Sequence, residues 1–427
     1  MYELSSGSSH GPYFIDLFAG AGGMSEGFVR AGFLPIAHVE MDVAACYTLR
    51  TREAFHRLSQ KGDLRIYSRY AEGQETRTKL YEAAFGKNAP NVVNAVICRE
   101  NLQKIFDHVD FLSHGRKPDV LIGGPPCQAY SLVGRARSEL GMIGDYRNYL
   151  FVYYVEFLKR YRPKYFVFEN VVGLLSAREK DGSRYLDMMM ALFEEVGYSV
   201  EWQVLSSDDF GVPQKRKRII LVGREGRKAS FFPEISKRDE GFCVNDVIGD
   251  LPSLSAGDGT PFSVHLSLEP SDWLKQSGIL SDDRSVTWHD ARPHNDRDLQ
   301  IFKEVVHRWE SQRERLNYND LPEKLKTHKN RKSFLDRFKV VASNLRASHT
   351  IVAHIAKDGN YYIHPDSNQN RSLTPREAAR IQTFPDNYYF EGASEKPSRT
   401  SAFKQIGNAV PVLLAQQVAE SLLENWS

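Results

Sequence analysis

The stretch "PYFIDLFAGAGGMSEGFVRAGF", residues 12–33, decides the fold class of this chain. Its apolar first part reads as a buried strand, and the part that begins at Gly23 reads as a helix. Gly20 and Gly22 lie in the turn between them. Strand-like and helix-like segments go on alternating as far as Gly223. This alternation predicts an α/β fold with a doubly wound, mostly parallel sheet.

The composition of the chain limits the classes of protein it can belong to. A length of 427 residues suggests two or three domains, and a net charge of +2 does not by itself indicate a nucleic-acid partner. Cys46, Cys98, Cys127 and Cys243 form no C-x-x-C pair, so we expect no zinc ribbon and no metal. No signal peptide and no apolar stretch near the ~20 residues of a membrane span are visible. We therefore expect a cytoplasmic protein with free thiols and no membrane association.

Three regions are predicted from the change in pattern along the chain. Residues 12–225 form the first domain, with a helical elaboration within 51–117. Residues 226–370, where the alternation fades, form a smaller domain. Residues 371–427 return to the first domain and complete it with a C-terminal helix. A capping box of Thr374 and Glu377, with Pro375 at the first helical position, marks a helix start in this return segment.

The first two strand ends suggest a nucleoside site. Ligands of an open parallel sheet bind beyond the carboxyl ends of its strands, and glycines after a strand allow close backbone approach. Glu40 ends the second strand, 20 residues after Gly20, an offset that suits an acid accepting hydrogen bonds from ribose hydroxyls. The spacing is not the full G-x-G-x-x-G pattern. A turn that only packs the helix on the strand is therefore the alternative.

A cysteine follows a third strand on a restricted backbone, in "PDVLIGGPPCQAYS", residues 118–131. Two prolines stiffen this loop, and two glycines let it turn or let a ligand approach. The pattern favours Cys127 as a catalytic nucleophile. A small buried hydrophobe is the alternative, because most free cysteines have that role.

Charged residues mark two further strand ends. Glu169 ends the apolar run "YFVFEN", where partial desolvation should raise its pKa and suit it to proton sharing. Its alternative role is a helix N-terminal acid. Arg216 and Arg218 in "QKRKR" alternate into a strand, so we expect both side chains on one face, facing an anion or a base edge. A solvated edge strand guarded by charge is the alternative.

Together these motifs resemble those of the cytosine-5 DNA methyltransferases of bacterial restriction-modification systems. The matching stretches are "DLFAGAGG", "GGPPCQAYS", "FENV", "QKRKR", "RSLTPREAARIQTFP" and "IGNAVP", all in the order of the family. The resemblance implies a Rossmann-like, S-adenosylmethionine-dependent methyltransferase fold with residues 226–370 as target-recognition domain. The acid and apolar pair that usually touches the adenine has no clear match. "NVVNAVICREN" stands where we would expect it.

The resemblance also implies roles for individual residues. Cys127 would attack carbon 6 of a flipped-out cytosine, so that carbon 5 can accept a methyl group from S-adenosylmethionine. Glu169 would bind ring nitrogen 3 and the amino edge, Arg218 the ring oxygen, and Arg216 would support the loop as the fourth member of the catalytic set. Cofactor contacts are expected from Asp16, Phe18, Ala19, Gly20, Gly22, Gly23, Met24, Glu40, Met41, Pro126, Leu150, Asn408 and Val410. Asn408 could equally cap a helix.

Double-stranded DNA is the expected partner. Gln128 and Ser131 of the nucleophile loop are expected to contact it. Residues 324–346 hold eight Lys or Arg and one acid, and Lys329, Arg331 and Lys332 are the expected phosphate contacts. A solvated helix face is the alternative for this cluster.

The expected setting is the bacterial cytoplasm, close to the nucleoid. The enzyme would act as a monomer, with a cognate restriction endonuclease or a defence complex as a possible partner. Three other functions fit parts of the pattern: a transfer-RNA methyltransferase of the same fold, a DNA-binding protein with a retired active site, and a nucleotide-dependent oxidoreductase. The basic segment disfavours the first, and the intact Cys127, Glu169 and Arg218 disfavour the others.

Overall fold

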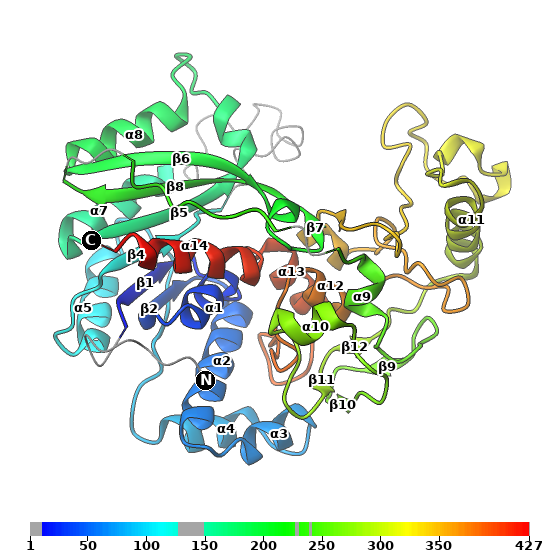
Figure 1. Ribbon diagram of the computed structural model, residues 1–427, viewed down its shortest axis with the longest axis horizontal. Helices are drawn as coiled ribbons and strands as arrows, with labels where there is room; N and C mark the ends of the chain where they lie inside the picture. Colours follow the sequence, from blue (N-terminus) through cyan, green and yellow to red (C-terminus); the bar gives the residue numbers. More distant parts are fainter. Residues whose placement is uncertain (1–10, 127–148, 227–229, 239–240, 427) are drawn as a thin grey trace.

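A seven-stranded sheet forms the centre of the computed structural model, which describes residues 11–126, 149–226, 230–238 and 241–426 (Figure 1). The strand order is β3-β2-β1-β4-β5-β8-β6, and β8 alone runs antiparallel to its neighbours. The strands are β1 (Tyr13–Leu17), β2 (Leu34–Glu40), β3 (Val92–Asn94), β4 (Val120–Gly123), β5 (Tyr165–Val171), β6 (Tyr198–Ser206) and β8 (Lys217–Glu225). The predicted α/β class with a mostly parallel sheet is confirmed.

Helices cover both faces of the sheet, which explains why its central strands β1, β4 and β5 are mainly apolar and buried. Alternate residues of β1 enter different cores: Phe14 packs with α1 (Gly23–Arg30) and α14 (Val412–Glu424), and Ile15 packs on the opposite face. The opposite face is covered by α5 (Leu102–Ser113), α7 (Leu150–Tyr161) and α8 (Tyr185–Glu195).

The C-terminal helix α14 packs against α1 and the central sheet. Its contact with α1 is so close that a Cβ at Gly27 would lie 2.5 Å from the Ala415 Cβ and 2.7 Å from the Val412 carbonyl oxygen. Figure 1 shows the two helices side by side although they lie at opposite ends of the chain. The first and last segments of the sequence therefore fold as one unit.

The elaboration expected within residues 51–117 is a helical layer after α2 (Val43–Gln60). It consists of α3 (Arg65–Ala71) and α4 (Arg77–Phe85). Thr51 and Tyr70 donate hydrogen bonds of 2.6 and 2.5 Å to the buried Glu391 carboxylate, so this layer is tied to the return segment.

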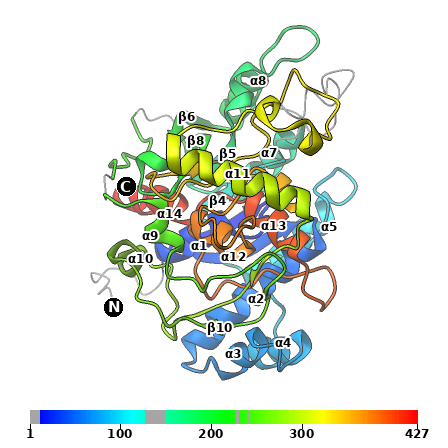
Figure 2. The same ribbon diagram turned by 90° about the vertical axis from the view of Figure 1, so that its right-hand side faces the viewer.

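The region between residues 241 and 370 contains two separate cores. Its first part packs with the return segment and with α3, through residues such as Trp273 and Trp288. Its second part has its own core around α11 (Asp296–Gln312). Figure 1 shows α11 at the opposite end of the molecule from α5 and α8, and in Figure 2 it faces the viewer. The remaining elements here are short: α9 (Val244–Ile248), β9 (Gly259–Thr260), β10 (Val264–His265), α10 (Asp272–Ser277), β11 (Ser285–Val286), β12 (His289–Asp290) and β13 (Ser348–His349).

The return segment contains α12 (Pro375–Ile381) and α13 (Arg399–Asn408). The predicted capping box is confirmed, since Thr374 and Glu377 bond reciprocally at the start of α12. Arg380 is fully buried, pairs with Asp386 through two 2.8 Å hydrogen bonds, and also contacts Asp250. These bonds fix α9 against α12. Within the described residues, no helix is long and apolar enough to cross a membrane.

Candidate active site

A tight turn after β1 brings the glycine motif to the carboxyl edge of the sheet. Phe18, Gly20 and Gly22 all have positive φ, of 58°, 55° and 80°. A Cβ at Gly20 would meet no atom within 4 Å, whereas a Cβ at Gly23 would lie 2.3 Å from the Val410 carbonyl oxygen. The turn is therefore open on one side and packed against the segment before α14 on the other.

Glu40 lies beside this turn, at the end of β2. Its carboxylate accepts N–H groups of Gly20 (2.8 Å), Met41 (2.8 Å) and Asp42 (2.7 Å). Burial raises the pKa of Glu40, and these N–H groups act in the opposite direction. Asp42 in turn caps α2 at Ala44. An acid is thus held in a fixed orientation beside the glycine turn.

Asp16 lies beneath the turn and is fully buried. Burial raises the pKa of Asp16 to about 8, the Ser25 hydroxyl lowers it through a 2.6 Å hydrogen bond, and the Glu40 charge raises it. The Asp16 carboxyl is consequently largely protonated at neutral pH, so it supports the turn without adding a full negative charge.

The other expected cofactor residues have different positions. Ala19 bonds to the Val39 carbonyl oxygen at the turn, and Met41 is 55% exposed beside Glu40. Met24 and Leu150 are buried, Pro126 is half-buried just beyond β4, and Val410 lies against the turn. Asn408 is exposed as the last residue of α13, so it caps no helix N-terminus.

Cys46 also lies here, and its position excludes it as the nucleophile. Its thiol donates to the Glu40 carbonyl oxygen at 3.3 Å, and burial raises the pKa of Cys46 to about 12. The residues that follow β3, where the adenine contact was left unassigned, adjoin this end. The Asn94 side-chain amide donates to the Glu40 and Met41 carbonyl oxygens, 3.1 Å from each.

Glu169 and Arg218 form an ion pair at the ends of β5 and β8. Arg218 stands opposite Val171 in the antiparallel register, two residues along β5 from Glu169. Its Nε lies 2.7 Å from the Glu169 Oε1 atom, and both side chains are largely buried, 12% and 14% exposed. A guanidinium therefore fixes the orientation of this carboxyl group.

The chain that leaves β4 passes directly over Glu169. A Cβ at Gly124 would lie 2.7 Å from the Glu169 Oε2 atom, and the Asn170 amide donates to the Pro125 carbonyl oxygen at 3.4 Å. The segment that leads to the cysteine motif thus begins beside Glu169. Cys127, Gln128 and Ser131 themselves lie outside the described residues.

Arg216 and Arg218 have separate partners, although the sequence predicts them on one face of one strand. The strand is interrupted at Arg216, which is 2% exposed and donates to the carbonyl oxygens of Ile351 (2.8 Å) and Gly407 (3.3 Å). The alternative of a solvated edge strand is wrong, because β8 lies between β5 and β6.

Three residues of this site had no role in the sequence interpretation. Asn170 and Gly124 hold the β4 exit against Glu169, and the Gly-Gly-Pro-Pro motif was the only signal for the second of them. Gln214 is fully buried, accepts the Ile351 N–H at 2.7 Å and donates to Gln382 at 3.0 Å. Its partners are more than a hundred residues away, so no local pattern could indicate them.

The basic cluster at residues 324–346 belongs in part to the second core of the region 241–370, through Leu325, Phe338 and Val340. Lys329 and Lys332 are exposed, and Arg331 is 3.5 Å from Glu323. The alternative of a helix face is wrong: Asn330 accepts the N–H groups of residues 332 and 333, and such side-chain bonds compete with helix formation.

A sheet of this topology, with a ligand turn after its first strand and an acid after its second, is that of the α/β methyltransferases. The sequence profile of the C-5 cytosine-specific DNA methylase family matches residues 13–69 and 70–424. The chain belongs to this family.

The relatives agree with this assignment over nearly the whole chain. The type II methyltransferase M.Bpa9945I of Bacillus paralicheniformis is 40% identical, over 96% of this chain and 98% of its own. M1.HphI of Haemophilus parahaemolyticus is 32% identical, over 96% and 86%. A crystal structure of a DNA modification methyltransferase encoded within an E. coli prophage covers 97% of this chain and 99% of its own, with a TM-score of 0.61. At 20% identity, it supports the fold alone.

Proposed function

We propose that this protein methylates carbon 5 of cytosine within a specific double-stranded DNA sequence, with S-adenosylmethionine as the methyl donor. The observation that carries the proposal is the position of two groups at one edge of the sheet. The glycine turn with Glu40 lies at the ends of β1 and β2, and the Glu169–Arg218 pair lies at the ends of β5 and β8. The cysteine motif follows β4, the strand between them.

The residues of the glycine turn fit the adenosine part of the cofactor. Gly20 leaves open space above the turn, and the Glu40 carboxylate can accept hydrogen bonds from ribose hydroxyls. Phe18 and the exposed Met41 offer apolar surface beside this acid. S-adenosylmethionine, when bound, supplies an electrophilic methyl group.

The base chemistry is assigned to Cys127, Glu169 and Arg218. The Cys127 thiolate adds to carbon 6 of cytosine, a carbon–sulfur bond forms, and the ring electrons make carbon 5 nucleophilic. Glu169 binds ring nitrogen 3 and the amino group, and Arg218 faces the ring oxygen, where negative charge develops. After methylation, carbon 5 loses its proton to a base and the carbon–sulfur bond breaks, which restores the ring and the thiolate. Arg216 supports the loop through its hydrogen bonds to the carbonyl oxygens of Ile351 and Gly407.

The target base must leave the duplex for this chemistry, at a cost of a few kcal/mol. We assign DNA recognition to the region within residues 226–370, with phosphate contacts from Lys329, Arg331 and Lys332. The relatives carry type II methyltransferase names, which supports a restriction-modification role in bacterial cytoplasm, with a partner endonuclease. We expect one protomer to act on each site.

The test is methyl transfer from labelled S-adenosylmethionine to unmethylated bacterial DNA, followed by sequencing for 5-methylcytosine. We expect methylation within one short recurring sequence and none with Cys127→Ser. Glu169→Gln should reduce turnover far more than DNA binding, because the contact acts mainly in the transition state. Transfer to RNA and not to DNA, or an equal loss of binding and turnover in Glu169→Gln, would contradict the proposal.

A further inference from the structure

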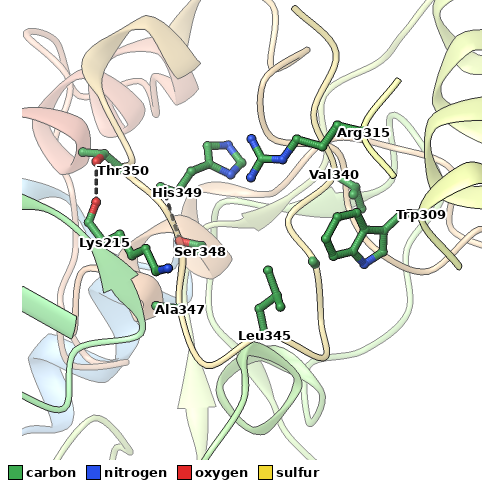
Figure 3. Close-up of a pocket in the computed structure, with 10 residues that line it drawn as sticks. Lys215, Trp309, Arg315, Val340, Leu345, Ala347, Ser348, His349 and Thr350 are labelled. Carbon is green, nitrogen blue, oxygen red and sulfur yellow. Dashed lines mark hydrogen bonds between the residues drawn. The ribbon is translucent and has the colours of Figure 1, made fainter. Parts of the chain in front are cut away.

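A concave pocket lies where the sheet domain meets the recognition region (Figure 3). β7 (Gln214–Lys215) pairs in parallel with β13, so that Lys215 stands beside His349. Trp309 of α11 and Arg315, just after it, form the opposite wall. The cavity has a volume of about 190 Å³ and is open to solvent on one side. Both parts of the molecule therefore contribute to one recess.

The pocket is lined by two cations and no acid. Its described lining includes Lys215 and Arg315 and no Asp or Glu. Among the described residues, neither of these two side chains forms an ion pair. The charge of Asp336 acts on both Arg315 and His349, but the Asp336 carboxylate pairs with Lys339, at 2.6 Å. Two cations with no acid in the same recess favour an anionic ligand.

The walls of the pocket are held in place by hydrogen bonds and stacking. The Trp309 indole N–H donates to the Asn344 side chain at 3.1 Å. The His349 Nε2 lies 2.5 Å from the Tyr361 carbonyl oxygen, and the ring stacks on Tyr362 at 5.1 Å. Burial lowers the pKa of His349 to about 4, so this ring adds no third charge at neutral pH. The two cations thus face a rigid, neutral surface.

The position of the pocket along the chain relates it to the catalytic pair. Lys215 precedes Arg218 by three residues, which can separate their Cα atoms by at most about 11 Å. Nucleotides advance along a DNA strand by about 3.4 Å each. A DNA strand whose target base reached Glu169 and Arg218 would therefore have a phosphate close to this pocket.

We infer that Lys215 and Arg315 together hold one backbone phosphate of the substrate DNA, within about three nucleotides of the target cytosine. This inference rests on the proposed function. A phosphate fits better than a base edge, because the recess presents two cations and a hydrophobic wall. The contact would fix the register between the recognition region and the catalytic pair without reading sequence.

The test uses the full-length enzyme and duplexes that contain the methylated sequence identified above. Lys215→Gln and Arg315→Gln each remove one charge from the pocket. Arg313→Gln removes the same charge two residues away, from an exposed position that does not line the pocket. Thermal unfolding of all three variants establishes that they fold. DNA affinity is measured at several salt concentrations, and again on duplexes with one uncharged methylphosphonate at each position near the target.

We expect each pocket variant to bind DNA about tenfold more weakly than the wild type, with a salt slope reduced by about one. One methylphosphonate position should weaken the wild type, weaken Arg315→Gln less, and leave the double variant Lys215→Gln/Arg315→Gln unaffected. Salt slopes equal to that of Arg313→Gln would overturn the inference, as would indifference to every methylphosphonate. Relaxed preference at a single base pair would also overturn it, in favour of a base-reading pocket. Absence of any methyl transfer by the wild type would instead refute the proposed function.

Discussion

Replacement of Gly124 by alanine should separate two strand ends that the chemistry needs together. The added Cβ would lie 2.7 Å from the Glu169 Oε2 atom and 2.8 Å from the Glu169 carbonyl oxygen. The side chain cannot simply swing away, because Arg218 holds it at 2.7 Å, and the carbonyl belongs to the central strand β5. The ends of β4 and β5 must therefore move apart by about 0.5 Å to restore ordinary contact.

A shift of this size at a reacting group should lower kcat roughly ten- to a hundredfold, since a 1 Å misplacement can cost about a hundredfold. The cost in stability should be about 1–3 kcal/mol, as for other overpacked sites. The assay is steady-state methyl transfer, with S-adenosylmethionine affinity measured by calorimetry as a separate readout that should stay unchanged.

Gly115→Ala provides the control for this prediction. Gly115 has a φ of 80° and open space around it, so alanine there should cost about 1 kcal/mol of backbone strain and leave kcat unaffected. A folded Gly124→Ala enzyme with kcat within twofold of the wild type would refute the reasoning. It would mean that the contact with Glu169 does not control the catalytic geometry.

Three further predictions follow from the buried charged groups. Glu40→Gln should weaken S-adenosylmethionine binding about tenfold. At a cofactor concentration about 100 times the wild-type Kd, the increase in the free energy of unfolding that the cofactor causes should fall from about 2.7 kcal/mol in the wild type to about 1.4 kcal/mol in the variant, measured by denaturant unfolding with and without the cofactor. An equal increase in both proteins would contradict this prediction. Arg380→Met should lower the free energy of unfolding by about 3–5 kcal/mol, measured in urea, because it leaves the buried Asp386 carboxylate without its ion-pair partner and leaves Asp250 with only the Arg284 contact at 3.4 Å. A loss below about 1 kcal/mol would count against this role. Asp16 keeps its proton up to pH about 8 in the folded state and only to about pH 4 when unfolded, so its contribution to the free energy of unfolding falls as pH rises between these values. In denaturant unfolding at several pH values, the free energy of unfolding of Asp16→Asn should therefore fall less over this range than that of the wild type. The same pH dependence in both proteins would exclude a raised pKa of Asp16.

The sequence predicts those parts of the site that depend on short-range rules. The alternation of strands and helices, the turn at Gly20 and the capping box at Thr374 each depend on residues only a few positions apart. Glu40 could be found because the carboxyl ends of neighbouring parallel strands meet at one edge. The Glu169–Arg218 pair was not predictable in this way. It requires β8 to insert in reverse between β5 and β6, which depends on how distant strands assemble.

The recognition region shows the same limit more strongly. Its described strands have two residues each, too few for a period of two to appear in the sequence. Its first part packs with the return segment, and its second part packs around α11. The composition shift near residue 226 therefore predicts where the second region begins. It does not predict the two cores of that region, which form through contacts between residues far apart in the sequence.

The segment 214–218 joins the region 241–370 to the Glu169 end of the sheet. Gln214 and Arg216 bond the backbone of Ile351, Lys215 pairs with β13, and Arg218 holds Glu169. Four residues of this short segment thus connect that region, to which we assign DNA recognition, with the Glu169 carboxyl group through backbone and side-chain bonds. DNA held by the recognition region would be placed relative to Glu169 by this segment. Substitutions at Gln214 should consequently alter turnover without any contact to DNA or cofactor.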